Sequence, residues 1–395
     1  MRIGIDCLRV DPEYFGGLNT YVLGVLDGFA AVGQDYDFLL FLNRGNEGFF
    51  EQYAGLSNFE TVVVDDRSLW LRQSLCRAAL LSGSSGIYCF ACGLMFEPIR
   101  EKLDAACDVI YTPTVALLCL NNCKPTLLSM HDIQHVHYPE FLSWPRRLSR
   151  RITYDLSASY ANYFQASSNF IKQDMLANYR QISPEQIEVI PEGVNLREFA
   201  LPRDTAPIAI RYELPERFLF LPAQLWPHKN HLTVLKALRQ IEERHGLRIP
   251  LVLTGAKYAG APAIFRLLVE QKMDYVRYLG RVSFDDLVGL YQSASFLVSA
   301  GLYESNSLPV LEAAAAGTPI IASDIPPNRE LAATLQLNLF DPLNVEQLAQ
   351  VIMQLWGERG TATEQALHNR THIVGYGWEN VARKYLRLLD RIAFS

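Results

Sequence analysis

The sequence of 395 residues lacks the marks of membrane-spanning, secreted and general nucleic-acid-binding proteins. No apolar run approaches the roughly 20 residues that a helix needs to cross a bilayer. The chain has 36 Lys and Arg residues against 42 Asp and Glu residues, and its net charge of −6 argues against a nucleic-acid partner. Its first six residues are typical of a strand and a turn, not of a secretion signal. We therefore expect a cytoplasmic globular protein, long enough for two domains.

Cysteine is absent after residue 123, and the seven cysteines before that point form an odd set. Without a secretion signal, such a set favours reduced thiols. Cys89 and Cys92 have the C-x-x-C spacing of some zinc and redox sites. Their apolar, glycine-flanked surroundings favour buried or partly buried thiols, and the spacing alone assigns them no function.

Strand and helix patterns alternate along nearly the whole chain, which indicates parallel sheets covered by helices. Strands are expected at residues 2–6, 37–42, 61–64, 109–112, 126–130, 164–166 and 187–190, and then at 218–221, 250–254, 276–279, 296–298 and 319–322. Helical patterns in the first half fall near residues 18–32, 68–81, 145–163 and 169–180. Two prolines and short polar residues at positions 200–207 suit a linker, which places a domain boundary near residue 205.

The most informative segment runs from Gly301 to Ser323. An apolar run before it predicts a strand, and the helix formers from Leu308 to Ala316 predict a helix. Glu304 therefore lies in a strand-to-helix loop, and Glu312 lies about one turn into the helix.

Backbone N–H groups lie between these two acids, at Asn306, Ser307 and Leu308. A helix start carries about half a positive charge and suits a phosphate. A sugar nucleotide would use both features, because its hydroxyls bond to carboxylates while its diphosphate bonds to N–H groups.

This segment resembles the E-x7-E motif of retaining glycosyltransferases of family 4, the glycosyl transferases group 1 type. Three further pieces fall in register with the family pattern: Leu308-Pro309, Glu312-Ala313 and Gly317-Thr318-Pro319. The resemblance implies that Glu304 contacts hydroxyls of the donor sugar and that Glu312 contacts the ribose. This chain departs from the family at Ser305-Asn306-Ser307, where members often have Gly-Phe-Gly.

The resemblance also implies a fold. The family has the GT-B fold, an α/β architecture of two Rossmann-like, doubly wound domains that face each other across a cleft. Residues 1–204 would form an acceptor-side domain, residues 205–377 a nucleotide-sugar-binding domain, and residues 378–395 a C-terminal helix that crosses back to the first domain. One face of that helix carries Val381, Tyr385, Leu388 and Leu389.

Other positions match pieces of the family's site. Gly16 and Gly17 follow the first strand, where two glycines let the backbone approach the donor phosphates and the acceptor. Lys229 is expected near a helix start, where its ammonium group can neutralise a leaving diphosphate. The family usually pairs such a lysine with a preceding arginine, and here that neighbourhood offers Gln224.

His131 ends the predicted strand at residues 126–130 and matches the family's histidine, which contacts the donor sugar near the reacting carbon. The spacing of His131, His135 and His137 could suggest a metal site. The residues around them disfavour the helix that such a site would need, so His135 and His137 are expected to be loop or packing residues.

No metal or other cofactor is expected. Asp35-Tyr36-Asp37 has the D-x-D spacing of metal-dependent glycosyltransferases of another fold, but it precedes a strand and is interpreted as a turn. Lys229 and helix N-termini can balance the diphosphate charge in place of a metal.

Arg146, Arg147, Arg150 and Arg151 are predicted to share one flank of a helix that begins at Trp144-Pro145. Such clusters are typical of solvated helix faces, and they also suit anionic lipid or a diphosphate-linked lipid acceptor. Because acceptors in the family are frequently polyprenyl-linked, the resemblance favours peripheral contact with the inner membrane surface.

The predicted function is retaining transfer of a hexose from a nucleoside-diphosphate sugar, of the UDP-glucose or GDP-mannose type, to a glycan or lipid-linked acceptor in cell-envelope or exopolysaccharide synthesis. The candidate catalytic residues are His131, Lys229 and Glu304, and no enzymic nucleophile stands out. The alternatives are a sugar-nucleotide epimerase of the same fold and a non-catalytic sugar-nucleotide-binding subunit. A dinucleotide-dependent oxidoreductase is disfavoured, because no G-x-G-x-x-G follows the first strand.

Overall fold

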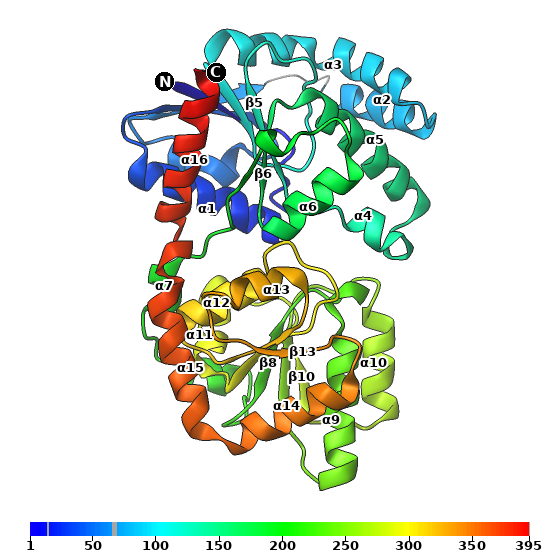
Figure 1. Cartoon of the computed structure of the whole chain (residues 1–395), viewed down its shortest axis with the longest axis vertical. Coiled ribbons are helices and arrows are strands. Elements are labelled where there is room, and N and C mark those ends of the chain that lie inside the picture. Colours follow the sequence, from blue (N-terminus) through cyan, green and yellow to red (C-terminus); the bar gives the residue numbers. More distant parts are fainter. Residues whose placement is uncertain (14–15, 65–68, 395) are drawn as a thin grey trace. The chain divides into compact units, whose positions relative to one another are not determined.

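The computed structural model describes residues 1–13, 16–64 and 69–394 (Figure 1). Contacts divide the chain into two units. The first contains Met1–Glu192 and the C-terminal helix α16 (Trp378–Ala393), and the second contains Gly193–Gly377. Each unit is built on one parallel sheet covered by helices, which confirms the predicted doubly wound α/β architecture.

The sheet of the first unit has seven parallel strands in the order β3-β2-β1-β4-β5-β6-β7. The chain moves outward from β1 to β3 and then returns to place β4 beside β1, so the direction of winding reverses between these two strands. Ligands of open parallel sheets bind outside the carboxyl ends of strands at such a point. All predicted strands of this half are present: β1 (Arg2–Asp6), β2 (Asp37–Asn43), β3 (Phe59–Val64), β4 (Val109–Thr112), β5 (Thr126–Met130), β6 (Tyr163–Ala166) and β7 (Ile187–Val189).

The sheet of the second unit repeats this topology with six strands in the order β10-β9-β8-β11-β12-β13. Its winding reverses between β8 and β11. The strands are β8 (Leu219–Pro222), β9 (Leu251–Thr254), β10 (Val276–Tyr278), β11 (Phe296–Ser299), β12 (Ile320–Ser323) and β13 (Asn338–Phe340). Only β13 was not predicted, because three residues are too few to show a period.

Helices cover both sheets. In the first unit they are α1 (Gly17–Val32), α2 (Leu69–Leu81), α3 (Ser85–Ala106), α4 (Gln134–His137), α5 (Trp144–Tyr160) and α6 (Asn169–Asn178). In the second unit they are α7 (Leu196–Ala200), α8 (Ala206–Arg211), α9 (His231–His245), α10 (Ala261–Glu270), α11 (Phe284–Ser293), α12 (Leu308–Ala316), α13 (Pro326–Leu331), α14 (Val345–Gly357) and α15 (Arg359–His372). None of the described helices is both long and apolar enough to cross a membrane.

The boundary between the units does not lie at the expected linker, residues 200–207. Residues 201–205 connect α7 to α8, but this connection lies inside the second unit, which begins at Gly193, before the expected residue 205. Phe199 is buried in the core of the second unit, and Val194 pairs with Gly377. Pro202 lies in this connection and Pro207 lies in the first turn of α8, so the composition marked a turn between two helices and not the boundary between the units.

Helix α16 lies along α1 in the first unit (Figure 1). Its four predicted core residues are all buried: Val381, Tyr385, Leu388 and Leu389. The two helices pack closely at Gly24, where a Cβ would lie 2.0 Å from the Trp378 ring. The hydroxyls of Tyr21 and Tyr385 are 2.5 Å apart, and the Tyr21 ring also packs edge-on against His131, with ring centroids 4.3 Å apart. The α1–α16 interface therefore supports one of the candidate site residues.

Candidate functional site

The candidate residues of the second unit follow β8 and β11, the neighbouring strands between which the winding reverses. Gln224 and Lys229 lie after β8, and Glu304 lies after β11. The Leu302 N–H donates a 2.8 Å hydrogen bond to the His228 carbonyl, which joins the two loops. Gln224 accepts a hydrogen bond from the indole of Trp226 at 3.0 Å, so its side chain is fixed within its own loop.

The structure brings Lys229 and Glu304 into direct contact. Lys229 Nζ donates to both carboxylate oxygens of Glu304 at 2.8 Å. Only 22% of the lysine side chain and 12% of the glutamate side chain are exposed, so much of the pair is withdrawn from water. Gly301 leaves the space that the carboxylate occupies, because a Cβ there would lie 2.5 Å from Glu304 Oε1. Such a pair loses hydration on both charges, and each partner compensates the other.

Ser307 holds a backbone conformation that explains the family's preference for glycine nearby. Its φ of 38° and ψ of 58° lie in the left-handed region, which a non-glycine residue seldom adopts. The buried Ser307 hydroxyl donates to Asn328 Oδ1 at 2.5 Å, and Asn328 Nδ2 donates to the Ser323 carbonyl at 2.8 Å. The Ser323 hydroxyl in turn donates to the Gly301 carbonyl at 2.7 Å. This network compensates for the left-handed turn and fixes the loop that carries Glu304.

The start of α12 lies immediately after this turn. Within the described ranges, the backbone N–H groups of Ser307 and Leu308 donate no hydrogen bond. Asn306 is buried in the same loop. The helix thus offers N–H groups and the positive end of its dipole beside the Lys229–Glu304 pair, and that arrangement suits an anion.

Glu312 has a partner within the protein that the sequence did not indicate. The Tyr291 hydroxyl, on α11, donates to Glu312 Oε2 at 2.5 Å. Burial raises the pKa of Glu312 to about 7, although the hydrogen bond from Tyr291 acts in the opposite direction. Among the described residues no hydrogen bond reaches Glu312 Oε1, and the side chain is only half-buried, so that oxygen can accept from a ligand hydroxyl. No sequence signal identified Tyr291, because helix packing creates the contact.

In the first unit, His131 lies at the end of β5 with 9% of its surface exposed. Its Nε2 is 2.9 Å from the Pro113 carbonyl, which can only accept, so the proton is on Nε2. Burial lowers the pKa of His131, and the ring is therefore neutral near pH 7. Nδ1 is then an acceptor, 3.8 Å from a carboxylate oxygen of Glu192. Such a ring could accept a hydrogen bond from a sugar hydroxyl but could not donate one through Nδ1.

The two candidate glycines lie where the first strand leads into α1. Gly17 is the first residue of that helix, and Gly16 precedes it with extended backbone (φ −171°, ψ 175°). The Gly16 carbonyl accepts from the Asn19 N–H at 3.1 Å. The two residues before Gly16 lie outside the described part of the chain.

The histidines after β5 contact different partners. Contrary to the prediction, a four-residue helix, α4, forms there. His137 Nε2 lies 2.7 Å from Asp174 Oδ2, whereas the His135 ring packs against Tyr154. In the described ranges, no three His, Cys, Asp or Glu side chains gather closely enough to hold a metal ion. The D-x-D sequence at residues 35–37 forms the predicted turn between α1 and β2.

The four clustered arginines of α5 do not all share an exposed flank. Arg146, Arg147 and Arg151 are exposed, as predicted. Arg150 is half-buried, and its guanidinium lies 3.2 Å from Asp132 Oδ1. The predicted helix is present, and Asp132 in the β5–α4 loop holds the Arg150 side chain partly out of the solvent.

The C-x-x-C cysteines lie on α3 and contact different partners. Cys92 is buried with its Sγ 3.4 Å from that of Cys76, and Cys89 is partly buried with its Sγ 3.3 Å from the Tyr160 hydroxyl. The prediction of buried or partly buried thiols is confirmed.

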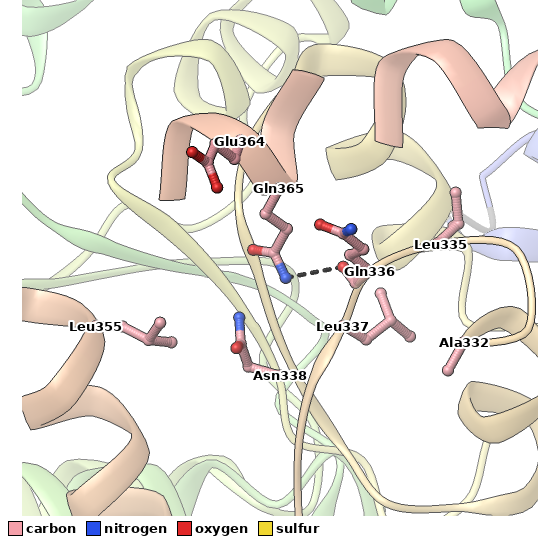
Figure 2. A pocket seen from close by; sticks show the side chains of 8 residues that line it. All are labelled: Ala332, Leu335, Gln336, Leu337, Asn338, Leu355, Glu364 and Gln365. Carbon is pink, nitrogen blue, oxygen red and sulfur yellow. Dashed lines mark hydrogen bonds between the residues drawn. The ribbon is translucent and has the colours of Figure 1, made fainter. Parts of the chain in front are cut away.

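A pocket of about 450 Å³ in the second unit lies away from these residues (Figure 2). Gln365 Nε2, in its wall, donates to the Gln336 carbonyl, and Gln365 Oε1 accepts from the N–H of Ile320, the first residue of β12. Asn338, another wall residue, begins β13. The pocket is therefore at the amino edge of the sheet, opposite the edge that carries Lys229 and Glu304.

Two family profiles match the chain. The family described as Glycosyl transferases group 1 matches residues 207–372, and the family described as Glycosyltransferase Family 4 matches residues 15–198. Together the two matches cover most of the sequence.

Individual relatives agree with these profiles. The chain is 27% identical over 235 residues to O-antigen chain mannosyltransferase RfbU of Salmonella typhimurium, covering 57% of this chain and 62% of that protein. It is 27% identical over 186 residues to O-antigen chain mannosyltransferase B of Escherichia coli, covering 45% and 47%. The matches thus span about half to three fifths of these relatives. Both are transferases, so the comparison does not favour the epimerase or the non-catalytic subunit.

A solved structure shows the same fold. Anabaena HepE, in complex with UDP and glucose, superposes with a TM-score of 0.74 at 16% identity, covering 99% of this chain and 100% of that one. This likeness supports the GT-B fold for the whole chain.

The environment of Glu312 predicts a specific dependence of stability on pH. Its pKa is near 7 in the native state and near 4.5 for an ordinary glutamate, so the native state binds more protons between these values. The free energy of unfolding should therefore fall as pH rises from about 4.5 to about 7. Glu312→Gln should remove up to about 3 kcal/mol of that fall.

Urea unfolding at about pH 5 and about pH 8 measures this effect. The free energy of unfolding of Glu312→Gln, relative to that of the wild type, should be higher at about pH 8 than at about pH 5. Glu101→Gln, at an exposed position of α3, is the matched control. An equal difference between wild type and Glu312→Gln at both pH values would contradict the assignment.

Proposed function

Because the chain belongs to the glycosyl transferases group 1, in their family 4 type with the GT-B fold, we propose that it transfers a hexose from a nucleoside-diphosphate sugar to a glycan or lipid-linked acceptor. The observation that carries the proposal is the contact between Lys229 and Glu304 beside the start of α12. The names of the mannosyltransferase relatives, and the UDP and glucose bound by the Anabaena protein, support a mannosyl or glucosyl donor used in O-antigen or related glycan synthesis.

In the proposed reaction, the bond between the sugar C1 and the diphosphate oxygen breaks, and the diphosphate keeps the electron pair. Lys229 and the N–H groups of Ser307 and Leu308 stabilise the charge that develops there. Glu304, released from Lys229, accepts hydrogen bonds from sugar hydroxyls and orients the ring. Glu312 Oε1 accepts from the ribose.

The acceptor hydroxyl attacks C1 on the face that the diphosphate leaves. Its oxygen forms the new bond, and its proton passes to the departing phosphate oxygen, so no enzymic nucleophile is needed. The family motif assigns His131 to the donor sugar, and its neutral ring would act there as an acceptor through Nδ1. Since cationic groups of the chain balance the diphosphate, the proposal includes no metal ion.

Substitution of the ion pair should separate the roles of its two members. Lys229→Met should slow hexose transfer by about 100-fold or more, because it removes a charge that stabilises the leaving group. It should also weaken binding of both the free nucleoside diphosphate and the sugar nucleotide. Glu304→Gln should weaken binding of the sugar nucleotide far more than binding of the free diphosphate.

Calorimetry and release of UDP or GDP from UDP-glucose and GDP-mannose, measured in EDTA, test these effects. Lys236→Met, which removes an exposed lysine of α9, should behave as wild type. Circular dichroism spectra must show that each variant is folded. Wild-type turnover in folded Lys229→Met would overturn the role of this lysine, and loss of wild-type activity in EDTA would overturn the metal-free reaction.

The stereochemistry of the product tests the same-face attack. Both proposed donors are α-linked at C1, so retention predicts an α-linked product. Proton NMR of the purified glycoside reports the anomer directly, and a β-linked product would refute the proposed step.

We also propose that the exposed arginines of α5 contact anionic membrane lipid. Arg146, Arg147 and Arg151 lie near Trp144, whose exposed fraction is 65%. Each arginine near an anionic surface contributes about 1 kcal/mol, so changing all three to glutamate should reduce binding at least about tenfold. Sedimentation with vesicles of phosphatidylglycerol and phosphatidylcholine measures this binding, and Arg180→Glu is the control. Equal sedimentation of wild type and the triple variant would exclude the contact.

A further inference from the structure

A cavity of about 610 Å³ lies in the first unit, and the proposed donor chemistry does not use it. Its walls include Leu8 to Pro12, which follow β1, and Val115 and Ala116, which follow β4. The winding of the first sheet reverses between these two strands. Residues of α2, α3 and α5, together with Asn43, Gly45 and Leu118, form the remaining walls. The cavity thus occupies the place where an open parallel sheet binds its ligand.

The charged groups of this cavity are mostly positive, although the whole chain has a net charge of −6. Arg9, Arg77 and Arg150 line it, against one acidic residue, Asp11. Among the residues that the structure describes, neither Arg9 nor Arg77 has a carboxylate within ion-pair distance. Arg150 forms an ion pair with Asp132. Arg9 hydrogen-bonds with Tyr88, another wall residue, and its charge also acts on the buried carboxyl of Asp6, so of the three guanidinium groups Arg77 has the least compensation in the described structure.

Other wall residues suit an ester better than a bare ion. Tyr154 lines the cavity, and its buried hydroxyl has no hydrogen-bond partner in the described structure. Leu80, Phe96 and Leu118 provide apolar surface in the same walls. A neutral ligand would leave the net positive charge of Arg9 and Arg77 uncompensated by a carboxylate within ion-pair distance. An anion with tetrahedral oxygens, joined to a larger organic group, would use both kinds of surface.

We propose that this cavity binds a phosphate or diphosphate ester, with Arg9 and Arg77 as the residues that hold the anion. On the proposed function, this ester is the end of the acceptor. The binding itself does not depend on the transfer reaction. Arg150, on α5, lines the same cavity and is already held by Asp132.

Inorganic pyrophosphate is a direct probe, provided that the proposed donor site is disabled. Calorimetry on the full chain with Lys229→Met should show saturable binding of pyrophosphate. Adding R9Q and R77Q should weaken it at least about tenfold, while adding R180Q, an exposed arginine outside the cavity, should not. Equal affinity in all three proteins, or no saturable binding, would overturn the site.

Chemical modification gives an answer even if the double substitution misfolds. Pyrophosphate should protect Arg9 and Arg77 of the unsubstituted protein from phenylglyoxal, as measured by peptide mass spectrometry, and should leave Arg180 reactive. Equal labelling with and without pyrophosphate would refute the assignment. UDP binding tests the donor site, and pyrophosphate binding tests the cavity. If UDP binding is retained in R9Q/R77Q and lost in Lys229→Met, the two sites are independent, and failure of one proposal does not imply failure of the other.

Competition then identifies the source of the phosphate group. If the acceptor is lipid-linked, farnesyl diphosphate should displace pyrophosphate at a lower concentration than glucose 1-phosphate does, because the apolar wall adds to its affinity. The reverse order supports a glycosyl phosphate. Failure of both compounds to displace pyrophosphate would contradict the proposal that the cavity takes an ester.

Discussion

The contact between Lys229 and Glu304 is the constraint on which the account of this protein depends. Both side chains are largely withdrawn from water, and each compensates the charge of the other. Such pairs contribute little net stability, because desolvation offsets much of the attraction. Their geometry suits exchange of partners: a diphosphate can take the ammonium group while sugar hydroxyls take the carboxylate. The ion pair then preorganises both groups without leaving either charge uncompensated when no donor is bound.

The surrounding structure keeps this pair in place through backbone rather than through long side chains. The bond between Leu302 and His228 ties the two loops together, and the absence of a side chain at Gly301 admits the carboxylate. The hydrogen bonds that link Ser307, Asn328 and Ser323 hold the turn before α12 in its left-handed conformation. A departure from the family's glycine-rich sequence is thus accommodated by hydrogen bonds, and the helix start keeps its N–H groups available.

Much of this could be predicted because it is local. Alternating apolar runs identified every strand except β13, and the order of Glu304, Leu308 and Glu312 placed a loop before a helix. What could not be predicted depends on contacts between distant segments. The bond from Tyr291 to Glu312 arises where α11 packs on α12, and Asp132 draws Arg150 away from its exposed neighbours. The α3 helix was also missed, because it contains Pro98 and two glycines that obscure a helical pattern.

A crystal structure of the protein with a non-transferable analogue of its donor tests the central claim most directly. The account predicts that Lys229 Nζ leaves Glu304 and lies within hydrogen-bond distance of a diphosphate oxygen, while the Glu304 carboxylate contacts a sugar hydroxyl. A bound donor whose diphosphate lies elsewhere, with the 2.8 Å ion pair intact, would contradict it.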